Sequence, residues 1–175
     1  AQNGVICNPN IPSEEVFTTP HALRVEGFVS STKPLSHQGT LIDNIRVVFE
    51  KGSITDAKAS KGETVLKKVL ESDEGARRLG EVALVPNSSP ISNSGLLFYN
   101  TLFDENAACH IALGQCYSKC FKGETNLSTS EIRERGGNSS MIHIDWMIGS
   151  GEIDIDGFGK NGEIVPIFRK GEWVD

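Results

Sequence analysis

A histidine and an aspartate stand two residues apart in the segment 142–148, which reads IHIDWMI. Side chains alternate along a strand, so His143 and Asp145 would share one face while the large apolar residues take the other. Imidazole and carboxylate together suit Zn²⁺ and similar divalent ions. The same pair also fits the solvent face of an ordinary antiparallel sheet. This motif alone therefore leaves a metal site and a plain polar strand both open.

Glu81 is followed by four apolar residues, 82–85, and this pattern predicts a strand buried on both faces. An unpaired buried carboxylate costs several kcal/mol. Glu81 is therefore expected to face either a metal ion or a salt bridge with Arg77 or Arg78 just upstream.

His110 lies in the segment 104–114, which the sequence predicts to be a helix with Asp104 near its start and Gly114 at its left-handed end. A continuous helix would separate His110 from Tyr117 by about 10.5 Å along its axis, too far for one metal ion. A chain reversal at Gly114 would bring Tyr117 back toward His110. Taken alone, His110 could also be a core histidine bonded to a backbone carbonyl.

The chain has four cysteines, Cys7, Cys109, Cys116 and Cys120, which are too few for a disulfide scaffold and indicate a reducing compartment. An alternative is a Cys3His zinc site formed by His110 with Cys109, Cys116 and Cys120. That alternative is weaker, because on a helix Cys109 would point about 100° away from His110. Small buried thiols are the simpler interpretation.

The elements that must position these residues are mostly strands. Apolar periodicity and turn residues predict strands over 14–18, 23–30, 41–50, 53–57, 81–85 and 141–148, and a hairpin of 152–156 with 163–168 across the turn 159–162. A helix is predicted over 62–72, with a short helical turn capped by Ser72 after it. The prediction is a single α+β domain over 1–175, a mostly antiparallel, barrel-like β-sheet domain with a few helices.

Composition narrows the functional classes. The 175 residues carry a net charge of −6 with no concentrated basic face, which disfavours a nucleic-acid partner. No apolar run reaches the roughly 20 residues that cross a bilayer, and no signal-peptide pattern is visible, so a cytoplasmic protein that does not bind membranes is expected. Because the chain does not begin with Met, we expect a piece of a longer protein.

Several segments, in this order, resemble one known family. They are EEVFT at 14–18, RLGEVALVP at 78–86, LFYNTLFDENA at 97–107, CHIALG at 109–114 and HIDW at 143–146. Together they are similar to the thermophilic metalloaminopeptidase family that includes aminopeptidases T and S. The resemblance spans essentially the whole chain. Family members are about twice as long and have a separate N-terminal domain, so the resemblance implies the C-terminal, metal-binding catalytic portion of a two-domain metallopeptidase.

The resemblance also implies a site for two divalent metal ions, with Zn²⁺ or Co²⁺ preferred and Mg²⁺ or Mn²⁺ as alternatives. By motif its ligands fall on six residues: Glu15, Glu81, His110, Tyr117, His143 and Asp145. Glu15 rather than Glu14 is chosen by the motif, since the sequence itself does not show which of the two neighbours faces inward.

The implied activity is removal of N-terminal residues from peptides with a free N-terminus, by a water that two metal ions activate while they also bind the substrate's amino group. Glu81 would bridge the ions, and Tyr117 would be a ligand or stabilise the oxyanion. The general base stays open among Glu14, Glu15 and Glu81. Full-length members are expected to be homodimers. Two alternatives are a metal-binding fragment without activity and a two-metal phosphodiesterase, which the acidic charge balance disfavours.

Overall fold

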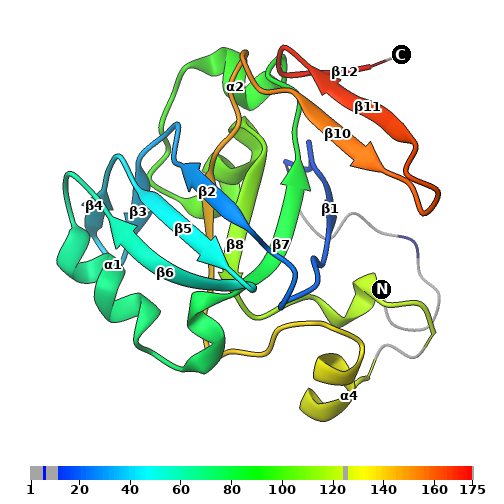
Figure 1. Cartoon of the computed structure of the whole chain (residues 1–175). Helices are drawn as coiled ribbons and strands as arrows, with labels where there is room; N and C mark the ends of the chain where they lie inside the picture. Colours follow the sequence, from blue (N-terminus) through cyan, green and yellow to red (C-terminus); the bar gives the residue numbers. More distant parts are fainter. Residues whose placement is uncertain (1–5, 7–11, 124–125, 175) are drawn as a thin grey trace.

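A four-stranded antiparallel sheet forms the centre of the protein in a computed structural model, which describes residues 6, 12–123 and 126–174 (Figure 1). Its strands follow the order β1-β7-β8-β9. They are β1 (Val16–Thr18), β7 (Leu79–Leu84), β8 (His110–Gly114) and β9 (His143–Met147). Segments far apart in the sequence therefore lie side by side in this sheet.

Three smaller antiparallel sheets surround it. One contains β2 (Gly27–Ser30), β5 (Arg46–Glu50) and β6 (Ser53–Lys58), and another is the hairpin of β3 (Leu35–His37) with β4 (Thr40–Ile42). The third contains β10 (Ile155–Phe158), β11 (Ile164–Arg169) and β12 (Glu172–Trp173) and lies at one side of the molecule (Figure 1).

The helices are short. They are α1 (Glu63–Leu70), α2 (Pro90–Ser94), α3 (Thr101–Asp104) and α4 (Thr129–Glu134), with 3₁₀ turns η2 (Glu74–Arg77), η3 (Glu105–Ala107) and η4 (Ser118–Cys120). Among the described residues, no helix has the length and apolar character that crossing a membrane requires.

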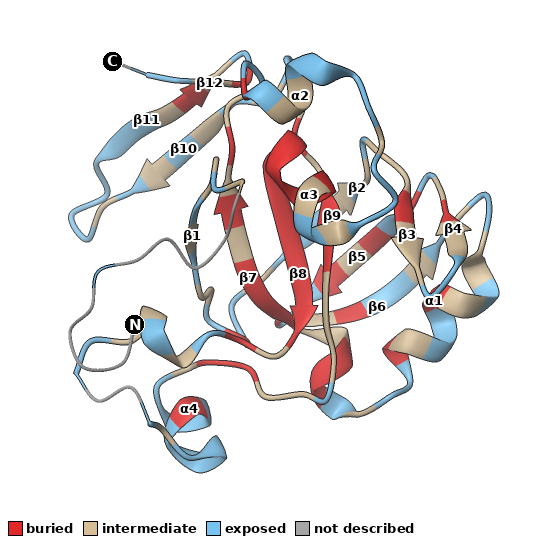
Figure 2. Cartoon of the chain, turned by 180° about the vertical axis from the view of Figure 1, so that it is seen from behind, coloured by how far each residue is buried: buried red, intermediate tan, exposed pale blue. Residues whose placement is uncertain are grey.

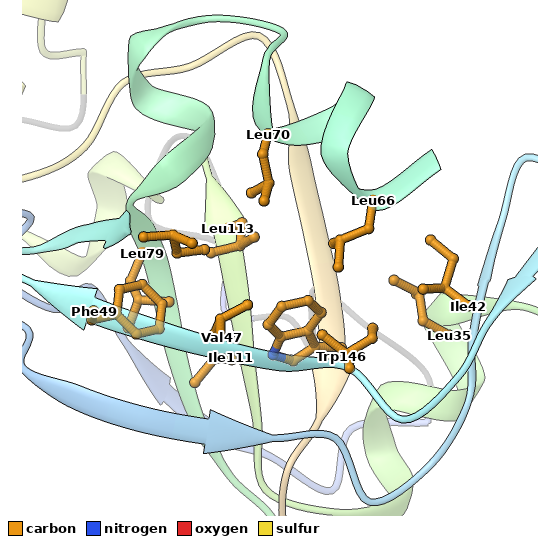
Figure 3. Packing of buried hydrophobic residues seen from close by; sticks show 12 residues of the cluster. Leu35, Ile42, Val47, Phe49, Leu66, Leu70, Leu79, Ile111, Leu113 and Trp146 are labelled. Atoms are coloured by element: carbon orange, nitrogen blue, oxygen red, sulfur yellow. The ribbon is translucent and has the colours of Figure 1, made fainter. Parts of the chain in front are cut away.

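The hydrophobic core fills the space between one face of the central sheet and the β2-β5-β6 sheet (Figure 3). Trp146 and Ile111 come from the central sheet, Val47 comes from β5, and α1 adds Leu66 and Leu70. Each fully buried side chain of this kind contributes roughly 1.5–3 kcal/mol relative to exposure. The core thus fixes which face of the central sheet is apolar and leaves the other face for different chemistry.

The mostly antiparallel α+β prediction is confirmed, but the predicted helix over 104–114 is wrong. Residues 101–107 form the short α3 and η3 turns, and His110–Gly114 is the strand β8. Every residue of β8 is buried because it pairs with a strand on each side and is covered on both faces (Figure 2). A short run buried on both faces loses the alternation that marks a strand, so its sequence reads like a buried helix.

Two smaller predictions also need correction. The strand predicted over 41–50 is divided into β4 and β5. The turn after α1 is a 3₁₀ turn whose N-cap is Asp73 rather than Ser72, with the Asp73 carboxylate accepting from Ala76 N. The hairpin of β10 and β11 agrees with the predicted turn at 159–162.

Candidate metal centre

A bulge at Gly80 decides which way Glu81 points. In the β7–β8 ladder Leu79 pairs with Leu113, but Glu81 pairs with Ala112 because one extra residue shifts the register. Without the shift Glu81 would oppose Ile111, which belongs to the core. A Cβ on Gly80 would lie 2.4 Å from Gln115 O, so glycine is required at this close approach.

The strand β8 provides room for the polar side chains of its neighbours. Ala112 lies between Glu81 on one side and Asp145 on the other, and Gly114 pairs with His143. Directly opposite Cβ atoms are about 5 Å apart, so small residues in the middle strand let longer neighbours lean together. Glu81, His110, His143 and Asp145 thereby share the face of the sheet that is opposite the core.

Glu15, Glu81 and His110 form a first group of donor atoms, each within 4.8 Å of the others. His110 Nε2 lies 3.0 Å from Glu15 Oε2 and 3.7 Å from Glu81 Oε1. Glu15 precedes β1 and is held in place through its neighbour, because the Glu14 N–H donates to Asn106 Oδ1 at 2.8 Å.

Glu81, His143 and Asp145 form a second group that meets the same 4.8 Å limit. His143 Nε2 lies 3.6 Å from Glu81 Oε2 and 3.4 Å from Asp145 Oδ1. The predicted His-x-Asp face is present, since Ile144 packs toward the core from the other side of β9. Glu81 belongs to both groups and presents one oxygen to each histidine.

Backbone carbonyls orient both imidazoles. His110 Nδ1 lies 3.1 Å from Ala108 O, and His143 Nδ1 lies 2.7 Å from Gln115 O. A hydrogen on each Nδ1 would serve these carbonyls and leave Nε2 of the neutral ring as an electron-pair donor. This arrangement is typical of metal-binding histidines.

The donor atoms are better placed to bind a metal ion than to hydrogen-bond with one another. Glu15 Oε2, Glu81 Oε2 and His110 Nε2 are fully buried and, despite their short separations, have no hydrogen-bond partner among the residues that the structure describes. Buried polar atoms without such partners are rare and costly. A cation in each donor group would give these atoms partners, because Glu15 Oε2 and His110 Nε2 belong to the first group and Glu81 Oε2 faces His143 in the second. The residues present therefore fit the divalent metal that such a donor set favours.

The same crowding of carboxylates shifts the pKa values of the site. Burial alone would lower the pKa of His110, but the carboxylates of Glu15 and Glu81 outweigh it and raise the pKa to about 10. For His143, burial is likewise outweighed by Asp145, and the pKa rises to about 9. In the metal-free chain both rings are therefore protonated at neutral pH.

The remaining predicted site residues are Tyr117 and Glu14, and the three donor groups include neither of them. The Tyr117 ring packs edge-on against His143, with the ring centres 5.0 Å apart, so the chain after Gly114 brings Tyr117 to His143; its predicted return toward His110 stays a prediction. Burial and the nearby carboxylates, Glu81 first among them, raise the pKa of Tyr117 to about 12. The Glu14 side chain belongs neither to a donor group nor to the cavity lining.

Glu105 is a further buried acid, which the sequence pattern does not predict as part of the site. Its carboxylate forms a third group with His110 and Asp145, again within 4.8 Å. Its position at the predicted start of a helix concealed it, because an acid is common there for reasons of local structure. All these groups open into a cavity of about 530 Å³ whose wall also includes Phe17 and Leu102.

The alternatives raised by the sequence find no support at these positions. The Arg77 and Arg78 guanidinium groups donate to backbone carbonyls, including Ile54 O and Ala22 O, rather than pairing with Glu81. The Cys109 thiol contacts the backbone of Val85. No cysteine belongs to a metal-donor group in the part of the chain that the structure describes; Cys7 lies outside the described residues.

Comparison with known proteins agrees with this geometry. The family model described as thermophilic metalloprotease (M29) matches residues 1–173. The chain belongs to this family. It is 55% identical to aminopeptidase T of Thermus aquaticus over 173 residues and 53% identical to aminopeptidase 2 of Geobacillus stearothermophilus over 174 residues. Each alignment covers 99% of this chain and 42% of the relative.

A solved structure shows the same fold. Wild-type AmpT from Thermus thermophilus superposes with a TM-score of 0.93 at 52% identity, and the match covers 99% of this chain and 43% of that structure. The chain thus spans less than half of the length of these relatives.

Proposed function

We propose that this chain carries the two-metal hydrolytic centre of an aminopeptidase that removes residues from peptides with a free N-terminus. The observation that supports this most is that Glu81 belongs to two donor groups, one completed by Glu15 and His110 and the other by His143 and Asp145. A carboxylate shared in this way suits a pair of cations. Two relatives that are 55% and 53% identical to this chain are named aminopeptidases.

The chain's own residues then have distinct tasks. Two bound divalent ions would supply Lewis acidity and a nucleophilic water at neutral pH. Glu15, Glu81, His110, His143 and Asp145 would hold them, and the carbonyls behind the imidazoles keep the rings oriented. Of the proposed general bases, Glu15 and Glu81 line the cavity and Glu14 does not, which favours the first two.

Tyr117 lies on the cavity wall against His143, where its hydroxyl can either complete the ligand set or donate a hydrogen bond to the oxyanion. A Tyr117→Phe variant separates the two roles. Lower metal content assigns the hydroxyl to the ligands, whereas normal metal content with a fall in kcat assigns it to the oxyanion.

The mixture of imidazole and carboxylate donors favours Zn²⁺ or Co²⁺ over Mg²⁺ or Mn²⁺. Peptide substrates and a homodimeric, cytoplasmic full-length protein stay predictions. The phosphodiesterase alternative is disfavoured, because the residues lining the cavity include four acids and only one lysine, Lys119.

A second candidate is that this chain binds the metal ions without hydrolysing peptides. The observation in its favour is that the chain spans 42% of its relatives, so part of a substrate cavity can come from elsewhere in a longer protein. Metal content by elemental analysis, measured beside hydrolysis of leucine 4-nitroanilide, decides between the candidates. Two metals with cleavage support the aminopeptidase, two metals without cleavage support the binding module, and absence of metal binding contradicts both.

A further inference from the structure

A second hollow adjoins the metal-binding cavity. It lies between α1, the tip of the β3–β4 hairpin (37–40) and the segment 141–144, and we call it the α1 groove. Its volume is about 540 Å³, and three of its residues also line the cavity: His37, His143 and Ile144. β3 contacts β9 and α1 contacts β4, so the hairpin and α1 lie on one side of β9 (Figure 2). A ligand held at the donor groups can therefore extend past His143 into the α1 groove.

One face of α1 forms a wall of this groove. Leu66 and Leu70 point into the core (Figure 3). Four other residues, at the helical spacing i, i+3, i+4 and i+7, line the groove: Val65, Lys68, Val69 and Ser72. At a helical rise this stripe is about 10.5 Å long, which matches roughly three residues of an extended chain.

The segment before β9 forms the opposite wall. Met141 and Ile142 belong to it, and Met141 is 81% exposed. Asp73, which follows the α1 stripe, joins the two walls, because its carboxylate accepts from Met141 N at 2.7 Å and from Ser140 Oγ at 2.9 Å. The walls are therefore held in place before a ligand binds, which limits the conformational entropy lost on binding.

The charged groups of the groove differ from those of the cavity. Among the described residues, the cavity lining includes four acids, whereas the groove lining includes Lys68 and no Asp or Glu. Lys68 forms no ion pair within the described part of the chain, while the adjacent Lys67 pairs with Glu63. An ammonium group beside an apolar wall suits a ligand that carries both apolar side chains and a carboxylate.

We propose that the α1 groove binds the two or three residues that follow the cleaved bond of a peptide substrate, and that Lys68 pairs with a carboxylate on them. The inference rests on the proposed function and gives its site a direction. The first residue stays at the donor groups, and the rest of the peptide leaves past His143 and Ile144. The carboxylate comes either from the C-terminus of a short peptide or from an acidic side chain.

Photolabelling locates the bound peptide. The probe is an unreactive tripeptide analogue, leucyl-glycyl-benzoylphenylalanine, in which CH₂–NH replaces the first peptide bond. On irradiation with the Zn²⁺-loaded chain, the excited ketone takes a hydrogen from a nearby C–H bond and its carbon then bonds to that carbon. Mass spectrometry should find the label on residues 65–72 or 140–142. A label confined to 101–105 or 117–119, on the other walls of the cavity, or no label at all, would overturn the inference.

Calorimetry tests Lys68 with the same analogue ending in phenylalanine, as the free carboxylate and as the carboxamide. At low salt the carboxylate should bind the unmodified chain about two- to fivefold more tightly, the range for an exposed ion pair. Lys68→Gln should abolish this preference. Lys67→Gln is the matched control, because it removes the neighbouring charge outside the groove and should keep the preference. Circular dichroism establishes that each variant is folded.

Two carboxamide analogues with glutamate or glutamine at the third position separate the sources of the carboxylate. A preference for glutamate assigns the pairing to a side chain, and a preference for the free terminus assigns it to the C-terminus. Equal binding of all these ligands, or a preference that survives in Lys68→Gln, would overturn the role of Lys68. Failure of the proposed function looks different, because the unmodified chain would then bind no metal or cleave no leucine 4-nitroanilide, wherever the label falls.

Discussion

Metal binding at neutral pH should release two protons from each chain, one from His110 and one from His143. In the metal-free chain the pKa of His110 is about 10 and that of His143 is about 9. At pH 7 about one His110 ring in 1,000 and one His143 ring in 100 is neutral. Because a metal ion binds neutral imidazole, both protons must leave when the two donor groups fill.

The energetic consequence is large. Deprotonating both rings at pH 7 costs about 7 kcal/mol in total, since each pKa unit corresponds to about 1.36 kcal/mol. Below pH 9 the product of the two metal affinities should fall by about 100-fold for each unit of pH, 10-fold for each proton. Above pH 10 the dependence on these two groups should vanish.

Calorimetric titration of Zn²⁺ in buffers of different ionisation enthalpy measures the number of protons released. We expect about two at pH 7 for the unmodified chain and about one for His143→Gln. His37→Gln is the matched control: burial lowers the pKa of His37, so this cavity histidine is neutral at pH 7 and has no proton to release. Release of fewer than one proton from the unmodified chain would show that the two imidazoles are not both protonated before metal binds.

Three further predictions concern stability and local structure. In the metal-free chain the raised pKa values of His110 and His143 stabilise the fold fully below about pH 6.5, and this stabilisation is gone once the pH has risen through 9 to 10. Thermal melts should therefore show a Tm that falls between about pH 6.5 and pH 10. Gly80→Ala should cost roughly 1–3 kcal/mol and reduce metal content, measured by urea unfolding and elemental analysis, whereas Gly151→Ala, whose Cβ would meet Asn87 at an ordinary 3.5 Å, should change neither. Asp73→Ala removes acceptors for Ala76 N, Ser140 Oγ and Met141 N and should cost about 2–4 kcal/mol by urea unfolding.

The sequence predicted the site best where a strand keeps one apolar face. In the segment 142–148 the alternation correctly placed His143 and Asp145 on the face opposite Ile144, because the core requires that face and a one-residue slip would bury the polar pair. The antiparallel character followed from many short strands separated by glycine-rich turns.

The features of the site that the sequence pattern does not predict have physical causes. The sequence pattern predicts a helix at His110 because β8 is buried on both faces and its small residues show no alternation. The direction of Glu81 depends on the bulge at Gly80, which only the pairing with β8 reveals. Glu105 was not assigned to the site because the fold of the α3 and η3 turns, rather than any local spacing, brings it beside His110. Long-range pairing thus supplied what the local pattern lacked.

Metal stoichiometry is the most direct test of whether two metal ions share Glu81. Metal-free chain should be titrated with Zn²⁺ at pH 8, with bound metal measured by elemental analysis for the unmodified chain, Glu81→Gln and His143→Ala. We expect two ions in the unmodified chain, loss of both tight sites in Glu81→Gln, and one ion in His143→Ala. A single ion in the unmodified chain, or two tightly bound ions in Glu81→Gln, would contradict it.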